Sequence, residues 1–369
     1  MWDNYCDLSA SDKQLCFDQL SEYADSLRRN PDLRELFIEM TINCNEHCIH
    51  CGSNCGDTVS KNALSDKEIL RMLVDLRNDL AECKKPLPFL SITGGEPLVR
   101  VGLIELMSKI HYLGYNWGMT SNGVLITPEV AHGLKEAGMY SIGLSLDGTR
   151  ETHEWFRQKT GSFDATINAI KNLQREQFNS LMVTTVVHRK NVGELEEMYR
   201  LLKALGIREW RLTNIEPIGR AIANNDLALE PAEYKCMLDF MADKQKDPDM
   251  QMLFTCNHYV GLAREHVIRP WFFFCKAGLQ LAAIQYDGTI GACLDIERRK
   301  DLSYGNVRTD RILKVWKERF EVFREHKADK STKCKNCVHK KNCQGGGYHT
   351  WDFDRNEPKI CMLEMIGEL

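Results

Sequence analysis

Short apolar runs alternate with longer amphipathic segments over much of the chain. Apolar runs that predict strands cover residues 36–42, 88–93, 115–120, 139–145, 181–187 and 208–213. Segments with apolar positions three and four residues apart follow these runs and predict helices over 65–80, 102–113, 163–177, 194–205 and 230–245, with one more beginning at Pro128. Strand–helix units of roughly 30 residues predict a parallel sheet covered by helices. Periodicity alone fits a doubly wound open sheet and a partial barrel equally.

The pattern also divides the chain into expected domains. Residues 1–35 read as an N-terminal helical segment, with Ser11 as a helix cap, and residues 36–246 carry the strand–helix units. Asp247-Pro248-Asp249 ends the last helix, and we expect no further strand–helix unit in the linker 247–274. Residues 275–369 are cysteine-rich and irregular, and we expect them to form a separate C-terminal domain.

Composition and charge narrow the function. The net charge of −4 over 369 residues does not favour nucleic acid or an anionic membrane surface as a partner. No apolar run is long enough to span a membrane, and the acidic start differs from a signal peptide, so we expect a cytoplasmic protein. In such a protein, 15 cysteines in clustered pairs indicate metal ligands more than disulfides.

The first cysteine cluster is Cys44, Cys48 and Cys51, which directly follows the strand predicted at 36–42. Thiolates are the ligands that hold iron–sulfur clusters. Three of them on one loop would leave the fourth iron of a cubane without a protein ligand, and an open metal position is a chemical site. A structural zinc site is the alternative, with His47, His50 or Cys55 as its fourth ligand.

Three further motifs follow at strand ends, and their order decides the interpretation. They are Gly94-Gly95-Glu96-Pro97, Ser121-Asn122-Gly123 and Ser145-Leu146-Asp147-Gly148. Together with the cysteine loop they resemble the radical S-adenosylmethionine (SAM) family, and the resemblance runs from about Leu36 to Cys361. It implies an α/β fold with a partial (β/α)6 TIM-like barrel over residues 36–246.

The resemblance also implies the cofactor chemistry. Cys44, Cys48 and Cys51 would hold a [4Fe–4S] cluster whose fourth iron is chelated by SAM. One electron would cleave SAM to a 5′-deoxyadenosyl radical, which abstracts hydrogen from a substrate. His50 is expected beside the adenine or at the solvent side.

Residues of the three motifs are the expected SAM contacts. Gly94 and Gly95 would allow close approach of the backbone to the ligand, and Glu96, followed by Pro97, would bind the methionine ammonium. The polar residues expected to bind the SAM carboxylate or ribose are Ser121, Asn122, Ser145 and Asp147. Turn formation is the alternative role for these residues. Arg157 is either a cation for the methionine carboxylate or an exposed helix residue.

The tail resembles the SPASM extension, which carries auxiliary iron–sulfur clusters. Cys334, Cys337, Cys343 and Cys361 match the ligands of the second auxiliary cluster. Cys275 and Cys293, at the foot of a hairpin with Gly288 in its turn, match the first, but Gly347 stands where a further cysteine is expected.

Several alternatives follow from this departure. The first auxiliary cluster keeps an open position, uses a non-cysteine ligand from Cys256, Tyr348 or His349, or is absent. A shorter "twitch" tail would hold one cluster through Cys275, Cys293, Cys334 and Cys337. Zinc bound near Cys334, Cys337 and Cys343 is a further alternative.

The resemblance specifies the reaction class more closely than the substrate. We expect oxidation or crosslinking of a peptide or protein, with a small sugar, aminoglycoside precursor or tetrapyrrole as the alternative, and flavodoxin or ferredoxin as electron donor. Asp295, two residues after Cys293, would be a general base or a surface acid paired with Arg298 or Arg299. A non-catalytic metal-binding interaction protein is the hypothesis from another class, and the intact cysteine and GGEP motifs argue against it.

Overall fold

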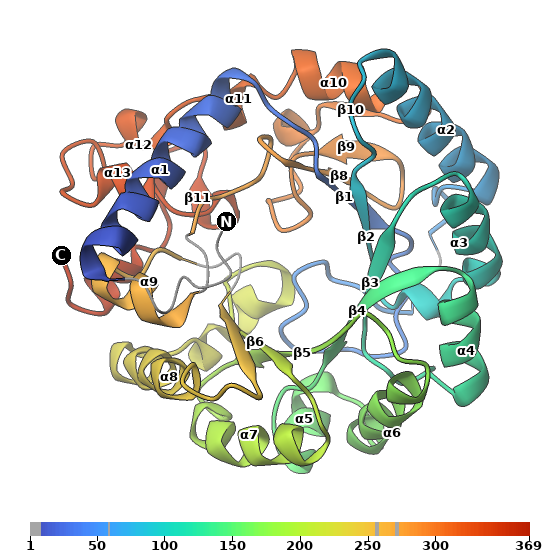
Figure 1. Ribbon diagram of the computed structural model, residues 1–369, viewed down its shortest axis with the longest axis horizontal. Helices are drawn as coiled ribbons and strands as arrows, with labels where there is room; N and C mark the ends of the chain where they lie inside the picture. Colours follow the sequence, from blue (N-terminus) through green and yellow to red (C-terminus); the bar gives the residue numbers. More distant parts are fainter. Residues whose placement is uncertain (1–8, 58–59, 255–257, 270–272) are drawn as a thin grey trace.

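The computed structural model describes residues 9–57, 60–254, 258–269 and 273–369. Ten strands form one sheet in the order β10-β9-β8-β1-β2-β3-β4-β5-β6-β7. Neighbouring strands are parallel from β8 through β1 to β7, whereas β8, β9 and β10 are antiparallel. The sheet curves around the centre of the molecule with helices on its outer side, so the fold is an α/β partial barrel (Figure 1). The strands are β1 Glu35–Glu39, β2 Phe89–Thr93, β3 Trp117–Ser121, β4 Met139–Ser145, β5 Ser180–Val187, β6 Glu209–Asn214, β7 Gln251–Phe254, β8 Leu281–Ile284, β9 Thr289–Gly291 and β10 Gly305–Asn306.

The six strands and six helices predicted between residues 36 and 245 are confirmed, with small shifts of their ends. The helices of this region are α2 Asp66–Glu82, α3 Leu103–Tyr112, α4 Pro128–Glu136, α5 Arg150–Arg157, α6 Ser162–Arg175, α7 Leu195–Ala204 and α8 Pro231–Lys244. Ser65 caps α2 in a capping box with Glu68, and Pro128 occupies the first turn of α4, as expected. The eight-residue α5 is additional.

Two sequence predictions about the flanking regions are wrong. Helix α1 (Ala10–Arg29) is capped by Ser9, whose hydroxyl accepts from the Asp12 amide at 3.2 Å, and not by Ser11. A seventh unit does follow Lys246, because β7 pairs with β6 in parallel and α9 (Leu262–Ile268) comes after it. A four-residue buried strand has no periodicity long enough to be recognised.

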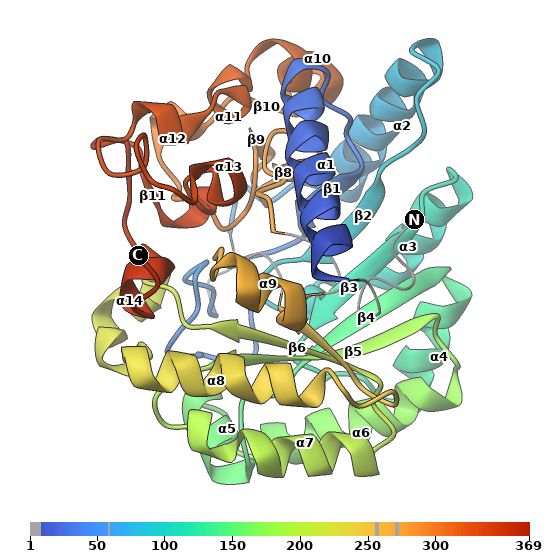
Figure 2. The ribbon, with the colours of Figure 1, turned by 60° about the vertical axis from the view of Figure 1, so that its left-hand side comes forward.

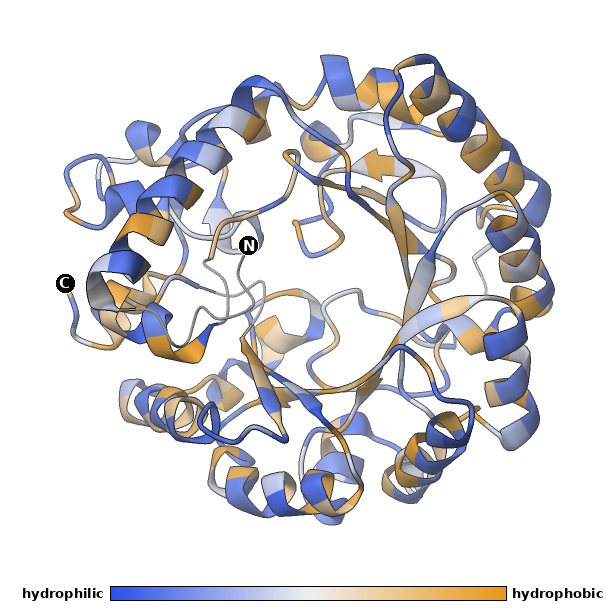
Figure 3. Ribbon diagram, viewed as in Figure 1, coloured by the Kyte–Doolittle hydropathy of each residue, from blue (hydrophilic) through white to orange (hydrophobic). Residues whose placement is uncertain are grey.

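Apolar residues fill the space between the sheet and the outer helices. Figure 3 shows hydrophobic residues along the strands and hydrophilic residues over much of the outer helix surface. The core includes Trp117 and Trp210, both fully buried. No helix in the described part of the chain is long and apolar enough to cross a membrane.

The tail extends the barrel sheet. Strands β8 and β9 form the predicted hairpin around Gly288, and β8 pairs in parallel with β1. Helix α1 packs against the tail helices α11 and α13, and Phe17 of α1 contacts Tyr259 near α9 (Figure 2). The remaining tail elements are α10 Ile312–Glu318, α11 Glu321–Arg324, α12 Lys327–Lys330, α13 Lys340–Cys343, β11 Trp351–Asp352, β12 Glu357–Pro358 and α14 Met362–Met365. The division into domains at residues 35, 246 and 274 stays a prediction.

Candidate active site

The loops that carry the sequence motifs meet at one end of the sheet. β1 to β6 are parallel, so the segments after each strand leave from the same edge. The cysteine loop follows β1, the Gly94 to Pro97 segment follows β2, and the Ser121 and Ser145 motifs follow β3 and β4. Parallel α/β folds place their active sites at this edge.

The three sulfurs of the cysteine loop lie near one another in a partly buried setting. Burial raises the pKa of Cys44 to about 11 and that of Cys48 to about 12, and the charge of Cys51 adds to both shifts. Hydrogen bonding to Cys55 lowers the pKa of Cys51. The three thiols of the loop therefore differ in their electrostatic surroundings.

The sulfurs of the cysteine loop, which lies in the described part of the chain, are not already gathered as ligands of one metal ion. Zinc holds its sulfur ligands at about 2.3 Å in a tetrahedron, which puts the sulfurs about 3.8 Å apart. Among the described residues, Glu216, His258 and His349 form the one group of three His, Cys, Asp or Glu ligands within 4.8 Å of one another. Of the expected fourth zinc ligands, His47 contacts Asp57 at 3.1 Å and the His50 ring stacks on Phe156. Cys44, Cys48 and Cys51 do not form such a close group.

A segment after β6 holds the cysteine loop in place. Arg220 Nε donates to the Cys48 carbonyl at 2.8 Å, and its Nη1 donates to the Cys55 carbonyl at 2.7 Å. The Arg220 amide also donates to the Cys51 carbonyl at 3.0 Å. Sequence reasoning missed Arg220, because no motif links it to a loop more than 160 residues away.

A buried ion-pair group lies behind the loop. Arg157 Nε contacts Asp147 at 2.6 Å, and its Nη1 contacts Glu46 at 3.2 Å. Arg157 is 8% exposed, so its interpretation as an exposed helix residue is wrong. Asp147 also accepts from the Val186 amide at 2.7 Å. These bonds give Asp147 a role in positioning Arg157 and β5.

Three aromatic rings stack beside the last cysteine of the loop. The His50 ring lies 4.0 Å from the Phe156 ring with an interplanar angle of 2°, and Phe156 stacks on His188 at 4.1 Å. Burial lowers the pKa of His50 to about 3, so the imidazole is neutral. No hydrogen-bond partner for His50 Nδ1 exists within the described ranges.

Glu96 is the buried acid of the second motif. Its carboxylate accepts from Ser121 Oγ at 2.9 Å, the Asn122 amide at 2.8 Å and the Leu98 amide at 3.2 Å. Burial raises its pKa to about 7 despite these donors. Ser121 and the Asn122 backbone thus position Glu96, while the Asn122 side chain donates to Asn45 at 2.7 Å.

Gly94 and Gly95 lie so close to the backbone of Thr41 and Asn43 that a side chain at either position would collide with it. A Cβ at Gly94 would lie 2.5 Å from the Thr41 carbonyl oxygen, and one at Gly95 would overlap the Asn43 carbonyl. The Gly95 amide donates to the Thr41 carbonyl at 2.7 Å. These glycines thus approach the chain that leads into the cysteine loop, and their expected approach to a ligand stays a prediction. Pro97 begins a short 3-10 helix, and Ser145 is half-buried at the end of β4.

Four tail cysteines surround a cavity. Cys334, Cys337, Cys343 and Cys361 line a cavity of about 280 Å³. Burial raises the pKa of Cys343 to about 12. Within the described chain, these four cysteines therefore face one common space that could hold a metal cluster.

Lys327 is buried close to the tail cysteines. Burial lowers its pKa to about 8, while negative charge on Cys275, Cys343 and Cys334 acts in the opposite direction. Its Nζ lies 4.1 Å from the Tyr348 ring centre and has no hydrogen-bond acceptor within the described residues.

At the first auxiliary site, Cys293 lies next to the expected base Asp295. Cys293 Sγ lies 4.0 Å from the exposed Asp295 carboxylate. Arg298 pairs with Glu39 and Arg299 with Asp301 and Asp354, so the expected pairing with Asp295 does not occur. Cys275 and Cys293 do not line the four-cysteine cavity.

Tyr348 and His349, two residues expected to replace the cysteine ligand missing at Gly347, make contacts with other protein groups. A Cβ at Gly347 would overlap the His349 ring, which occupies that space. Tyr348 Oη donates to the Val322 carbonyl at 3.1 Å, and His349 is directed at Glu216. Cys256 lies outside the described residues.

Comparison with known families gives two matches along the chain. Residues 38–202 match the radical SAM superfamily, and residues 275–338 match the iron–sulfur cluster-binding domain SPASM.

Curated relatives are similar over most of their lengths. The mycofactocin maturase MftC of Mycolicibacterium smegmatis is 31% identical over 314 residues, which cover 84% of this chain and 76% of the relative. The AdoMet-dependent heme synthase of Methanosarcina barkeri is 28% identical over 324 residues, which cover 83% of this chain and 89% of the relative.

Solved structures share the fold. The structure of anSMEcpe with bound AdoMet and the Cp18Cys peptide has a TM-score of 0.71 at 19% identity, covering 92% of this chain and 95% of that one. SuiB of Streptococcus suis bound to S-adenosylmethionine has a TM-score of 0.68 at 18% identity, and the match covers 86% of this chain and 74% of SuiB.

Proposed function

Because the chain belongs to the radical SAM superfamily and carries a SPASM domain, we propose that Cys44, Cys48 and Cys51 hold its [4Fe–4S] cluster. The protein is a radical SAM enzyme, and its cofactors are this cluster, SAM and auxiliary iron–sulfur clusters. The observation that supports the ligand assignment is the position of the three cysteines on the loop after β1, within the range 38–202 that matches the radical SAM superfamily. When bound, the cluster and SAM supply reductive cleavage of the sulfonium and abstraction of a substrate hydrogen.

Protein groups around this loop orient and shield the cofactor. Glu96 presents a buried carboxylate for the methionine ammonium, held by Ser121 and the Asn122 backbone. Arg220 fixes the carbonyls of the cysteine loop, and the Arg157 ion pairs brace it from behind. His50, neutral and stacked on Phe156, offers a flat surface beside the loop for the adenine.

The tail is proposed to hold two auxiliary clusters. Cys334, Cys337, Cys343 and Cys361 would hold one within their shared cavity. Cys275 and Cys293 would hold the other, with an incomplete cysteine set because residue 347 is glycine. Because these four cysteines line one cavity, we favour this arrangement over a twitch-type cluster shared with Cys275 and Cys293. Flavodoxin or ferredoxin would supply electrons, and Asp295 would act as base near Cys293.

A peptide or protein side chain is the proposed substrate. The relative with 31% identity is named as the maturase of mycofactocin. A tetrapyrrole is the second candidate, because a relative of which 89% is covered by the match is named as a heme synthase. We also propose a cytoplasmic location and the domain division into 36–246 and 275–369, with which the matched ranges 38–202 and 275–338 agree.

The cofactor assignment is tested by anaerobic reconstitution with iron and sulfide, followed by SAM and dithionite. The wild-type chain should release 5′-deoxyadenosine, and Cys48→Ala should release none. Cys83→Ala, which removes an exposed cysteine outside the clusters, is the control. Equal release by Cys48→Ala would contradict the assignment.

Iron counting tests the tail. Three [4Fe–4S] clusters give about twelve irons per chain, and Cys361→Ala should lower the count by about four. An unchanged count would contradict the assignment of Cys361.

The substrate is tested by supplying two probes separately. One is a library of short peptides, and the other is iron-coproporphyrin III, which appears in the name of a relative 29% identical over 328 residues. A mass change in a peptide together with faster 5′-deoxyadenosine release supports the first candidate, and a change in the porphyrin alone supports the second.

A further inference from the structure

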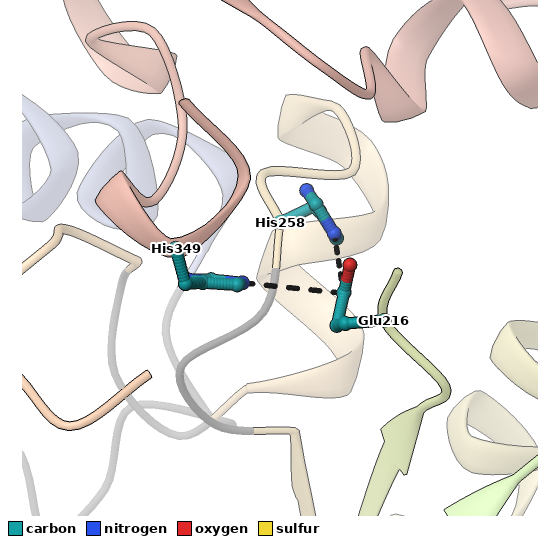
Figure 4. Close-up of side chains that lie close together, drawn as sticks. All are labelled: Glu216, His258 and His349. Carbon is teal, nitrogen blue, oxygen red and sulfur yellow. Dashed lines mark hydrogen bonds and ion pairs between the residues drawn. The ribbon is translucent and has the colours of Figure 1, made fainter. Parts of the chain in front are cut away.

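Three side chains that no cluster assignment uses converge between the barrel and the tail. Glu216 follows β6, His258 precedes α9, and His349 lies in the 3-10 helix Tyr348–Thr350 of the tail. Figure 4 shows both imidazoles directed at the carboxylate of Glu216. Glu216 Oε1 lies 2.7 Å from His258 Nε2 and 4.0 Å from His349 Nε2.

Neighbouring groups hold two of the three in position. Asn214 Nδ2 donates to Glu216 Oε1 at 2.8 Å. Arg269 Nη2 donates to the His258 carbonyl at 2.8 Å, and Arg269 is itself paired with the buried Glu265. The side chains of Glu216 and His349 are each 12% exposed and that of His258 is 4% exposed. The group is therefore formed in advance and largely shielded from water.

One carboxylate oxygen of Glu216 accepts no hydrogen bond within the described residues. This oxygen, Oε2, is buried. A buried acceptor without a partner costs about 1–3 kcal/mol, more when charged, so such an atom calls for an explanation. A cation would supply the missing partner.

The donor atoms suit a cation. The group offers one carboxylate oxygen and two imidazole nitrogens. Carboxylate and imidazole groups together are a common ligand set for transition metals.

We propose that Glu216, His258 and His349 form a mononuclear site for a divalent transition-metal ion, separate from the iron–sulfur clusters. Their ligand atoms lie within 4.8 Å of one another, the spacing at which one ion can bridge all three after small side-chain shifts. Two histidines and one carboxylate leave other coordination positions open. The ligands come from residues 216, 258 and 349, so the ion would also link the barrel to the tail.

Manganese binding to the full, cluster-loaded chain tests this site. The protein is reconstituted anaerobically and freed of loose metal with a chelating resin, so that its cysteines are occupied by clusters. Mn²⁺ is then titrated while the electron paramagnetic resonance signal of free Mn²⁺ is measured, because a hard ion discriminates against thiolates. We expect one bound ion per chain and its displacement by Zn²⁺, which binds more tightly in the Irving–Williams order.

Variants separate a metal site from a hydrogen-bonded group. Glu216→Gln and His258→Asn should each weaken Mn²⁺ binding by roughly tenfold or more while iron content and circular dichroism are unchanged. His132→Asn removes an exposed histidine that lies 3.2 Å from Glu176, and it should bind as the wild type does. Failure of both ions to bind the wild-type chain, or unchanged binding by Glu216→Gln, would overturn the proposal. The readout does not depend on SAM cleavage, so its failure is distinct from failure of the proposed reaction.

Discussion

At the level of single residues, Glu96 combines full burial with three hydrogen-bond donors. Burial disfavours the charged form and the donors favour it, and burial dominates, since the pKa is raised to about 7. A positively charged ligand group beside this carboxyl would stabilise the ionised form. Ligand affinity and pH are therefore linked through one proton.

This linkage predicts how SAM affinity depends on pH. Below pH 7 the carboxyl is mostly protonated, so the affinity of the reconstituted chain should rise between pH 6 and 7.5 and level off above. Glu96→Gln should weaken binding at pH 8 by about 1.5–3 kcal/mol, the range for hydrogen bonds to charged groups, and flatten the profile. Equilibrium binding measured under anaerobic conditions checks both. Glu105→Gln, on the exposed side of α3, should keep the wild-type profile.

Lys327 is the second residue whose setting predicts a measurable effect. Its ammonium is buried near Cys275, Cys334 and Cys343 and has aromatic rings as close neighbours. A nearby positive charge favours addition of an electron to a cluster. Lys327→Met should therefore lower an auxiliary-cluster reduction potential by tens of millivolts, on the order expected for one partly screened charge. Redox titration followed by electron paramagnetic resonance checks this, with Lys330→Met as the control at an exposed position of α12.

At the level of elements, the cysteine loop depends on the segment after β6. Arg220→Leu would leave the Cys55 carbonyl without its side-chain donor, at a cost of about 1–3 kcal/mol, while the Cys48 carbonyl would keep only the Cys51 amide at 3.2 Å. We expect faster loss of iron from the first cluster and lower SAM cleavage. Iron release to a chelator, timed against the wild type, checks the loss. Arg189→Leu removes a surface ion pair with Glu230 and should leave the release rate unchanged.

Elements with long periodic patterns or strong end signals were predictable from sequence. Helix α2 has an apolar stripe and a capping Ser65, and both appear as expected. Helix α5 and strand β7 are too short for a periodic pattern to stand out. The motif residues were likewise found from their order along the chain. Arg220, Glu216 and His258 were not, because contacts between distant segments leave no local pattern.

At the level of the whole molecule, the tail is part of the barrel sheet. β8 pairs with β1 from Leu281 opposite Glu35 to Ile284 opposite Ile38. Arg298 also contacts the buried Glu39 at the end of β1, at 2.5 Å. Residue 275 is where the chain becomes rich in cysteines. The hydrogen-bonded sheet nevertheless continues past this residue, since β8 pairs with β1. Strand pairing over more than 240 residues could not be read from local composition.

This continuity predicts that the barrel is not stable without the tail. A chain ending at residue 274 would expose the β1 edge and the apolar side chains of Leu36 and Ile38, which are now buried. An unpaired apolar edge strand promotes aggregation. We expect this shortened chain to aggregate and to lack a cooperative thermal transition in scanning calorimetry. The control is a full-length chain with Cys334→Ser and Cys361→Ser, which loses cluster ligands but keeps β8 to β10. A shortened chain that unfolded cooperatively would contradict this prediction. Loss of the cooperative transition in the control as well would show that the cluster, and not the sheet alone, stabilises the barrel.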